Sequence, residues 1–328
     1  MLHYNALPME SNAIIKIDNL SYRYGAEHHA LEGMSFTVQP GEIFGFLGPN
    51  GSGKTTLFRI LATLLPVQSG RITVGNLDLS QEQARVRAML GIVFQSPSLD
   101  KKLTLAENMT HQGHLYGVHG VELRQRTGEL LERFRLSDRA DETVENLSGG
   151  LQRRVEIAKA LIHRPAVLLL DEPSTGLDPG VRRDLWHLLR SLQVERQVTI
   201  LLTTHLMDEA DQCDRLLVLD QGKKITVDTP SVLKGQVKGT VITARTKDPE
   251  ALRELVRTRL NFPVRVVEGS LRLEWQPESS QGTAAEWAGR LLQEFPQEIE
   301  AVTLSQPTLE DVFIQLTGRK FEADSAVT

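Results

Sequence analysis

The segment GPNGSGKTTL, residues 48–57, follows the apolar run EIFGFL and leads into a stretch with helical spacing. Its first eight residues match the phosphate-loop pattern, in which a glycine and four further residues precede Gly-Lys-Ser/Thr. Glycines let backbone N–H groups turn inward around an anion, where side chains would clash. A strand before the loop and a helix after it favour a phosphate-binding loop over an ordinary turn.

The loop predicts a nucleotide site in which each residue type has a physical role. Lys54 would supply a cation for the β- and γ-phosphates, and the Thr55 hydroxyl would coordinate Mg²⁺. The helix expected over residues 54–65 would point its positive N-terminus at the same phosphates. The apolar residues with helical spacing in this segment are Leu57, Ile60, Leu61 and Leu64. The residues predicted to contact the nucleotide are Gly48, Pro49, Asn50, Gly51, Ser52, Gly53, Lys54, Thr55 and Thr56.

A second apolar run, in VLLLDEPSTGLD, supplies the acidic residues that such a site needs. Asp171 follows the apolar residues directly, at the carboxyl end of the expected strand, where open α/β sheets bind their ligands. We expect Asp171 to hold Mg²⁺ through water. Glu172 comes next and points elsewhere, so that it could polarise an attacking water as general base. The alternative, a strand that ends in solvated acids, does not explain why a phosphate loop accompanies it.

Composition limits the class of protein. The chain has 328 residues, of which 40% are hydrophobic and 24% charged, as in a globular protein of about two domains. The net charge of -5 offers no bulk attraction to nucleic acid, and we expect no nucleic-acid partner. The single cysteine, Cys213, cannot form an internal disulfide. No apolar run reaches the ~18–20 residues of a membrane span, and no signal peptide is visible, so we expect a cytoplasmic location.

The order of expected elements divides the chain into two domains. Strands and helices alternate over residues 12–230, which predicts an α/β domain around a largely parallel sheet. A polar, amphipathic stretch at about 100–160 interrupts the alternation and predicts a helical subdomain. Residues 236–319 have the order βαββαβ, which predicts a small ferredoxin-like α+β domain. Residues 320–328 are expected to be a flexible tail.

The second domain is expected to contain seven elements. They are a strand at 237–245, a helix at 249–260, strands at 264–267 and 271–275, a helix at 283–295, a strand at 299–304 and a helix at 308–316. The last helix is amphipathic, and its expected buried residues are Leu309, Val312, Phe313 and Leu316. The segment QPESSQG, residues 276–282, is expected to be a loop between the two halves of the domain.

The stretch LSGGLQRRVEIAKAL, residues 147–161, decides which class of phosphate-loop protein this is. It places Ser148, Gly149 and Gly150 at the start of an amphipathic helix, which is again an anion site. It resembles the signature motif of ABC-type ATPases. The commonest signature has glutamine at its fifth position, whereas this chain has Leu151 there and Gln152 next, but the Ser-Gly-Gly core is intact.

Further motifs of the same family stand in the expected order over residues 14–228. Tyr24 resembles the aromatic residue that stacks on adenine, and Gln95 resembles the glutamine of the Q-loop. Residues 174–178, STGLD, resemble the D-loop, whose last residue is Asp178. His205, at the end of LLTTH, resembles the switch histidine. The resemblance implies the fold of an ABC cassette, a P-loop NTPase with a helical subdomain insert, and hydrolysis of ATP with Mg²⁺.

The resemblance also implies how these residues act together. Two copies, or one copy and a similar partner, would sandwich two ATP molecules head to tail, and we expect a homodimer. Ser148 and Gly150 of one copy would meet the phosphates held by the other. Thr55, Asp171 and Gln95 would organise Mg²⁺ and water. His205 would contact the γ-phosphate, and Asp178 would communicate across the dimer.

Several features favour transport among the activities of this family. The chain has one cassette, whereas relatives that act in translation usually carry two. It also has no long coiled-coil arms and no evident basic patch, features that would favour an activity on DNA. The segments QSPSLDKKLTLAENM, residues 95–109, and QPTLEDVFIQLTGR, residues 306–319, resemble the drug-resistance branch of exporter ATPases, which includes daunorubicin-type exporters. The resemblance therefore favours export over import, through a separate transmembrane permease.

The permease would hold this subunit on the inner face of the cell membrane. Its cytoplasmic helices would be gripped by the helical subdomain and the region around Gln95. One alternative from another class stays open, namely a soluble ABC ATPase that regulates a ribosome or a nucleoprotein. A neighbouring gene for a polytopic membrane protein would favour the exporter.

Overall fold

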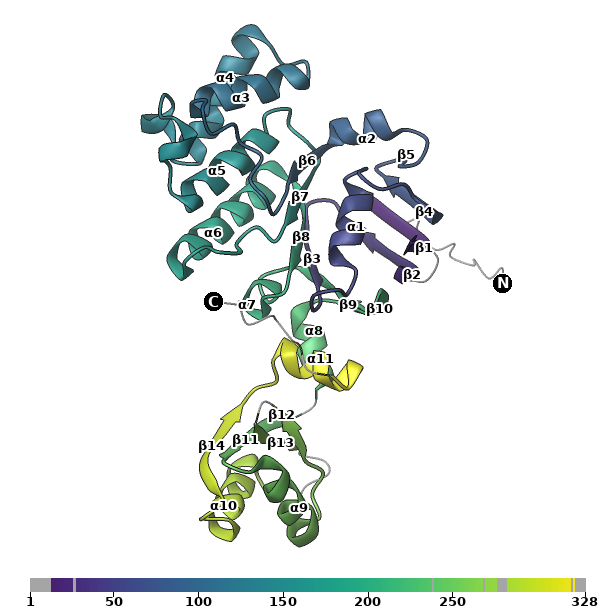
Figure 1. Ribbon diagram of the computed structural model, residues 1–328, viewed down its shortest axis with the longest axis vertical. Helices are drawn as coiled ribbons and strands as arrows, with labels where there is room; N and C mark the ends of the chain where they lie inside the picture. The colour runs from purple at the N-terminus through teal and green to yellow at the C-terminus, as the bar shows by residue number, and fades with distance from the viewer. Residues whose placement is uncertain are drawn as a thin grey trace, which may run out of the picture. The chain divides into compact units, whose positions relative to one another are not determined.

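The computed structural model describes residues 13–25, 28–237, 239–267, 269–275, 282–319 and 321. The chain divides into two compact units, and the division falls between Val227 and Asp228 (Figure 1). Unit 2 thus begins eight residues before position 236, because helix α8 (Pro230–Gln236) packs against helix α11 (Leu309–Thr317) of the same unit. The start of the chain, most of the expected loop at 276–282 and most of the expected tail at 320–328 lie outside the described residues.

A largely parallel sheet of six strands forms the centre of unit 1, as the sequence predicted. Its strand order is β10-β9-β3-β8-β7-β6, and the pairs from β9 to β6 are parallel. The strands are β3 (Ile43–Leu47), β6 (Leu90–Val93), β7 (Val167–Asp171), β8 (Thr199–Thr204), β9 (Arg215–Asp220) and β10 (Lys223–Asp228). Every residue of β3, β7 and β8 is buried, which explains the apolar runs within these strands.

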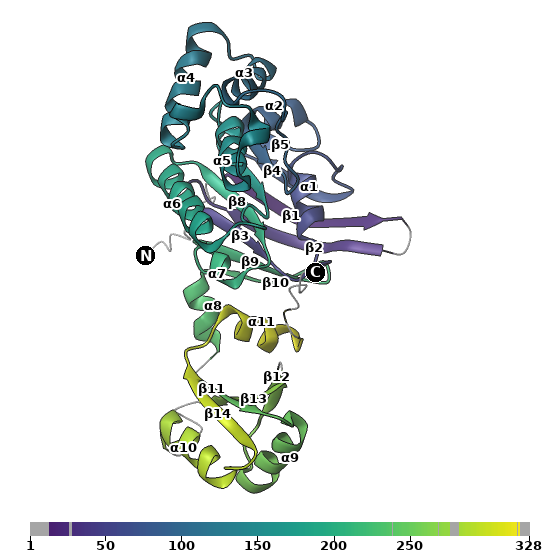
Figure 2. The same ribbon diagram turned by 60° about the vertical axis from the view of Figure 1, so that its left-hand side comes forward.

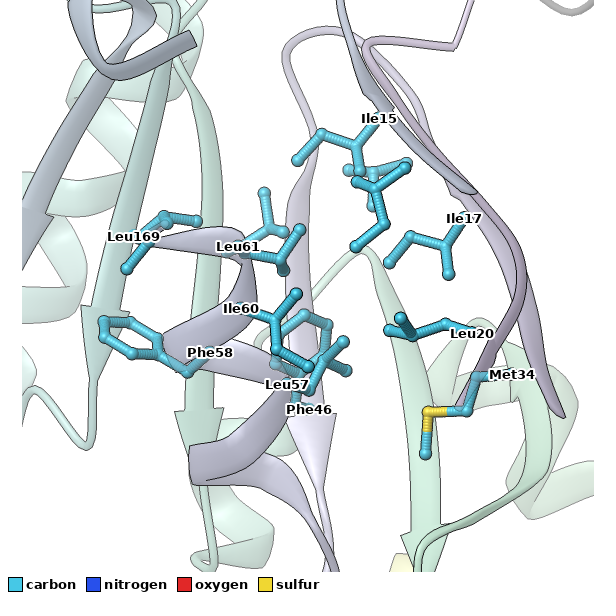
Figure 3. Close-up of a cluster of buried hydrophobic side chains, with 14 of the residues drawn as sticks. Ile15, Ile17, Leu20, Met34, Phe46, Leu57, Phe58, Ile60, Leu61 and Leu169 are labelled. Atoms are coloured by element: carbon cyan, nitrogen blue, oxygen red, sulfur yellow. The ribbon is translucent and has the colours of Figure 1, made fainter. Parts of the chain in front are cut away.

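A second, antiparallel sheet faces helix α1 (Lys54–Leu61) from its other side (Figure 3). Its order is β2-β1-β4-β5. The strands are β1 (Ile15–Tyr24), β2 (His28–Val38), β4 (Ser69–Val74) and β5 (Leu77–Asp78). Leu57, Phe58, Ile60 and Leu61 of α1 share one buried cluster with residues of both sheets, so α1 is packed on two sides.

Helix α1 is shorter than the sequence predicted. It ends at Leu61, and Thr63 then turns the chain with φ 60°. Leu64, which fits the helical spacing, lies beyond this turn and is 57% exposed. The apolar pattern extended past the true end of the helix because periodicity alone does not register a backbone turn.

Helices form the rest of unit 1. They are α2 (Gln83–Met89), α3 (Leu105–Leu115), α4 (Gly120–Arg133), α5 (Gly149–Ala160), α6 (Pro179–Arg196) and α7 (Met207–Ala210), with 3-10 turns η1 (Ser137–Arg139) and η2 (Val144–Asn146). Helices α3, α4 and α5 pack together at one end of the unit (Figure 2). A capping box between Thr104 and Glu107 fixes the start of α3.

Unit 2 contains the expected βαββαβ order. Its elements after α8 are β11 (Thr240–Thr246), α9 (Pro249–Leu260), β12 (Arg265–Val267), β13 (Ser270–Trp275), α10 (Ala284–Glu294), β14 (Ile299–Ser305) and α11. The strands pair antiparallel in the order β12-β13-β11-β14, which confirms the ferredoxin-like topology. Residues of α9 and α10 share one buried cluster with the sheet. The first strand begins at Thr240 rather than at residue 237, because Val237 is the C-cap of α8.

The buried face of α11 differs from the expectation at one residue. Leu309, Val312 and Phe313 are buried, but Leu316 is 42% exposed, and Ile314 is buried instead. The contacts of α11 concentrate in its first two turns, where Asp311 forms an ion pair with Arg272 of β13. The last turn of α11, which carries Leu316, therefore extends beyond these contacts.

His163 joins the end of α3 to the central sheet. Its ring stacks on the ring of Tyr116, with centroids 3.7 Å apart, and its Nε2 lies 3.0 Å from the carbonyl oxygen of Leu90 in β6. Burial lowers the pKa of His163 from 6.5 to about 4. The imidazole is consequently neutral in the folded protein at neutral pH, and it is protonated more easily in the unfolded chain.

We expect His163 to make the fold sensitive to acid. The unfolded chain binds an extra proton between pH 6.5 and about pH 4, so the free energy of unfolding falls across this window. In His163→Gln, which has no titrating side chain, the fall should be smaller by on the order of 1–2 kcal/mol, allowing for partial exposure. Urea unfolding of both proteins at pH 7.5 and pH 4.5 measures this. Equal losses in the two proteins would contradict the neutral imidazole.

Candidate functional site

The phosphate loop connects β3 to α1 and has a backbone that its glycines permit. Gly53 is the N-cap of α1, and its φ of 103° is left-handed. A Cβ atom at Gly53 would lie 2.7 Å from the carbonyl oxygen of Ala30. At Gly48 it would lie 2.4 Å from Ser52 Oγ and 2.5 Å from the carbonyl oxygen of Leu219. Larger residues would therefore displace the neighbouring chain.

Lys54 lies within this loop as a buried cation. Lys54 is only 4% exposed. Its Nζ donates to the carbonyl oxygens of Gly48 at 2.6 Å and Pro49 at 2.9 Å. Burial lowers the pKa of Lys54, while the carboxylates of Glu172 and Asp171 act to raise it. The Ser52 hydroxyl is buried, and it has no hydrogen-bond partner among the residues that the structure describes. A buried ammonium beside an unsatisfied hydroxyl fits the phosphates of ATP.

Asp171 and Thr203 meet at the carboxyl ends of two neighbouring strands. The Thr203 hydroxyl donates to Asp171 Oδ1 at 2.6 Å and accepts from the backbone N–H of Glu172 at 2.9 Å. Burial raises the pKa of the Asp171 carboxyl. Carboxylate and hydroxyl oxygens are the ligands that Mg²⁺ prefers, so the side chains of Asp171 and Thr55 have the chemistry that a magnesium site needs.

The Glu172 carboxylate brings three distant segments together. It accepts from Gln95 Nε2 at 3.1 Å and from the Thr175 hydroxyl at 3.1 Å, and its Oε1 lies 3.2 Å from His205 Nδ1. Its backbone has φ 44°, a left-handed conformation that costs free energy in a residue with a side chain. This turn directs Glu172 away from Asp171 and toward Gln95 and His205.

The signature residues lie at the start of α5 and contact α6. Ser148 is the N-cap of α5, and its hydroxyl accepts from Leu151 N at 3.4 Å. A Cβ atom at Gly150 would lie 2.6 Å from Val181 Cγ1. Among the described residues, the hydrogen bond of the Ser148 hydroxyl is to its own helix. The structure does not bring Ser148 into the group around Glu172.

Asp178 lies at the start of α6, and Tyr24 lies at the end of β1. Asp178 is the N-cap of α6, and its Oδ1 accepts from the N–H groups of Gly180 and Val181, each at 3.0 Å. Tyr24 ends β1 and is 40% exposed. Its hydroxyl lies 3.5 Å from the Thr56 hydroxyl of α1, so the ring stands beside the phosphate-loop helix.

Arg153 is a residue of the site that the sequence did not reveal. From α5 its guanidinium donates to the carbonyl oxygens of Phe94 at 2.6 Å, Pro173 at 2.8 Å and Asp171 at 3.1 Å. It also pairs with the buried Glu156 at 3.0 Å. Arg153 therefore ties the signature helix to the strand ends that carry Gln95 and Asp171. Its neighbour Arg154 has the same side chain, so the sequence offers no signal that separates the two.

Comparison with known proteins tests the resemblance. The profile of the family described as ABC transporter matches residues 31–175. The daunorubicin resistance ATP-binding protein DrrA2 of Streptomyces coeruleorubidus is 39% identical over 317 residues, which cover 95% of this chain and 97% of that protein. The chain belongs to the ABC transporter family. The predicted family and the predicted cassette fold are confirmed.

Two further relatives extend the comparison. The Nod factor export ATP-binding protein I of Sinorhizobium fredii is 38% identical, over 95% of this chain and 88% of that protein. A solved structure of a dimeric, post-hydrolysis ATP-binding cassette with ADP and phosphate has a TM-score of 0.59 and 30% identity, over 66% of this chain and 98% of that chain. As a member of this family, the chain is an ATP-binding ATPase. In its described part, no helix has the length and apolarity to cross a membrane.

Substitution of Arg153 should destabilise the fold more than substitution of Arg154. Arg153→Met leaves three carbonyl groups without their donor and Glu156 without its cation, so we expect the free energy of unfolding to fall by about 3 kcal/mol. Arg154→Met removes a pair with the exposed Asp184, and the fall should stay below about 1 kcal/mol. Urea denaturation of the two variants compares them, and equal falls would refute the assigned role of Arg153.

Proposed function

We propose that this chain is the ATP-hydrolysing subunit of an ABC exporter, and that ATP-driven dimerisation couples it to a separate membrane permease. The observation that carries the proposal is the similarity over nearly the whole chain to ATP-binding proteins named for drug resistance and for Nod factor export. The match includes unit 2, which lies outside the family profile of residues 31–175.

The proposed chemistry is attack of water on the γ-phosphate of ATP. Lys54 and the N–H groups of the loop neutralise phosphate charge. Glu172 accepts the proton of the attacking water, and its contacts with Gln95, Thr175 and His205 hold the carboxylate in one orientation. His205 contacts the γ-phosphate and registers its loss.

Mg²⁺ and a second subunit would complete this site. Thr55, Gln95 and Asp171 are the residues that would hold Mg²⁺, which when bound offsets the negative charge of the phosphates. Ser148 and Gly150 lie at the start of α5, and we assign them to the ATP of the partner copy. The dimeric form of the similar cassette with ADP and phosphate supports this arrangement. ATP then favours the closed pair through its higher affinity for that state.

The helical subdomain is the proposed contact with the permease. The segment that follows Gln95 leads directly into α3, so a change at Gln95 can be transmitted to the subdomain surface. The protein would accordingly act on the inner face of the cell membrane. The pocket for the exported substrate would then lie in the permease.

Glu172→Gln should separate ATP binding from hydrolysis. The amide keeps the size of the side chain but cannot accept a proton, so we expect kcat to fall by about 10²-fold or more while ATP still binds. The variant should also accumulate as a dimer with ATP. Phosphate release and light scattering measure the two effects. Glu142→Gln, which changes an exposed pair with Arg139, should behave as wild type. Normal turnover in Glu172→Gln would exclude Glu172 as the base.

The transport assignment is tested by isolating the tagged protein from its native membranes in detergent. Mass spectrometry should find a polytopic membrane protein in stoichiometric amount. A homodimer predicts that no second ATPase sequence accompanies it. Recovery only from the soluble fraction, with ribosomal proteins or nucleic acid attached, would overturn the exporter and favour a soluble regulatory ATPase.

A further inference from the structure

Within the part of unit 1 that the structure describes, two polar atoms face each other without a hydrogen-bond partner. Arg182 Nε, in the first turns of α6, lies 3.9 Å from Glu209 Oε1 in α7. Both atoms are buried and unsatisfied, and Glu209 is only 1% exposed. Buried polar atoms are nearly always satisfied, so two such atoms in mutual contact call for a physical explanation.

The other carboxylate oxygen of Glu209 is linked by hydrogen bonds to the residues on both sides of His205. Oε2 accepts from the Thr204 hydroxyl at 2.6 Å, and the same hydroxyl accepts from Leu206 N at 3.0 Å. His205 lies between these two residues, and its Nδ1 is 3.2 Å from Glu172 Oε1. The position of the histidine therefore depends on the carboxylate of Glu209.

The other end of Arg182 reaches the segment that precedes α6. One terminal nitrogen lies 3.4 Å from the carbonyl oxygen of Leu177, to which it donates. Leu177 is next to Asp178, the N-cap of α6. Through this hydrogen bond, Arg182 contacts the segment of residues 174–178. The contact between Arg182 and Glu209 joins this segment to the histidine segment 204–206.

A contribution to the stability of the fold does not explain the contact between Arg182 and Glu209 well. Burial raises the pKa of Glu209, and the charges of Arg182 and His205 act against that rise. A buried carboxylate that is not fully hydrogen-bonded costs free energy, and a packed apolar residue would commonly serve stability as well. A separation of 3.9 Å is about 1 Å longer than a charge-assisted hydrogen bond, so a small movement of α6 would form or break one.

We propose that Arg182 and Glu209 are a positioning pair for ATP hydrolysis, which couples residues 174–178 to His205. The inference rests on the proposed role of His205 at the γ-phosphate. Neither side chain touches the substrate. Arg182 transmits the position of Leu177, and Glu209 transmits it through Thr204 to the backbone of the histidine.

Four variants of the full-length chain isolate the pair. Glu209→Gln keeps an oxygen for the Thr204 hydroxyl but removes the charge that faces Arg182. Arg182→Gln removes the cation, and the double variant removes both. Arg183→Gln is the matched control, because Arg183 is the exposed neighbour on the same helix. The measurements are kcat and KM for ATP, together with the unfolding temperature.

We expect Glu209→Gln and Arg182→Gln each to lower kcat about tenfold, because misplacing a catalytic group slows the chemical step. KM for ATP should stay within about twofold, since the phosphate loop is untouched. The double variant should be no slower than either single variant, because both remove one shared contact. Arg183→Gln should match wild type.

Three results would overturn the pair. The first is normal kcat in Glu209→Gln. The second is a double variant whose loss equals the product of the two single losses. The third is a parallel fall in kcat and unfolding temperature, which would mark a structural role. His205→Ala is measured beside them. If it keeps full activity, the proposed role of His205 fails and the pair falls with it. If it is impaired while Glu209→Gln is normal, only the pair is wrong.

Discussion

The packing of α1 between two sheets is the constraint on which the site depends. Leu57, Phe58, Ile60 and Leu61 bury the helix on both sides, so its first residue, Lys54, has one position relative to β3 (Figure 3). The loop before it closes on itself through the two carbonyl groups that Lys54 binds. A phosphate cradle made of backbone atoms requires such support, because its donors cannot adjust by rotating side chains.

Charged side chains of both signs lie around this loop in unit 1, and they affect one another's pKa values and positions. Burial lowers the pKa of Lys54, and the carboxylates of Glu172 and Asp171 oppose that shift. Arg153 donates a hydrogen bond to the carbonyl oxygen of Asp171. Glu172 is held in a left-handed turn by hydrogen bonds from other segments. The cost of this conformation is offset by contacts that fix the carboxylate, which is how strained residues persist at catalytic sites.

Unit 2 is a separate fold with its own core. Its topology follows from a simple pattern of alternating strands joined by two amphipathic helices, and the buried cluster under α9 and α10 needs no contribution from unit 1. The ion pair of Arg272 with Asp311 attaches α11 to the sheet of this unit. The segment that resembles the exporter branch thus also has a structural role within unit 2.

The sequence alone determined the phosphate loop, the parallel core, the ferredoxin-like order and the family, because local motifs and the periodicity of short segments indicate each of them. Only the tertiary structure decided where the helix after the loop ends, which arginine of the pair at 153 and 154 is buried, and that Leu316 is exposed. It also brought Gln95, Glu172 and His205 together, and Arg182 to Glu209. These features depend on contacts between segments that are far apart in the chain, and a local sequence pattern does not predict which distant residue a side chain will contact.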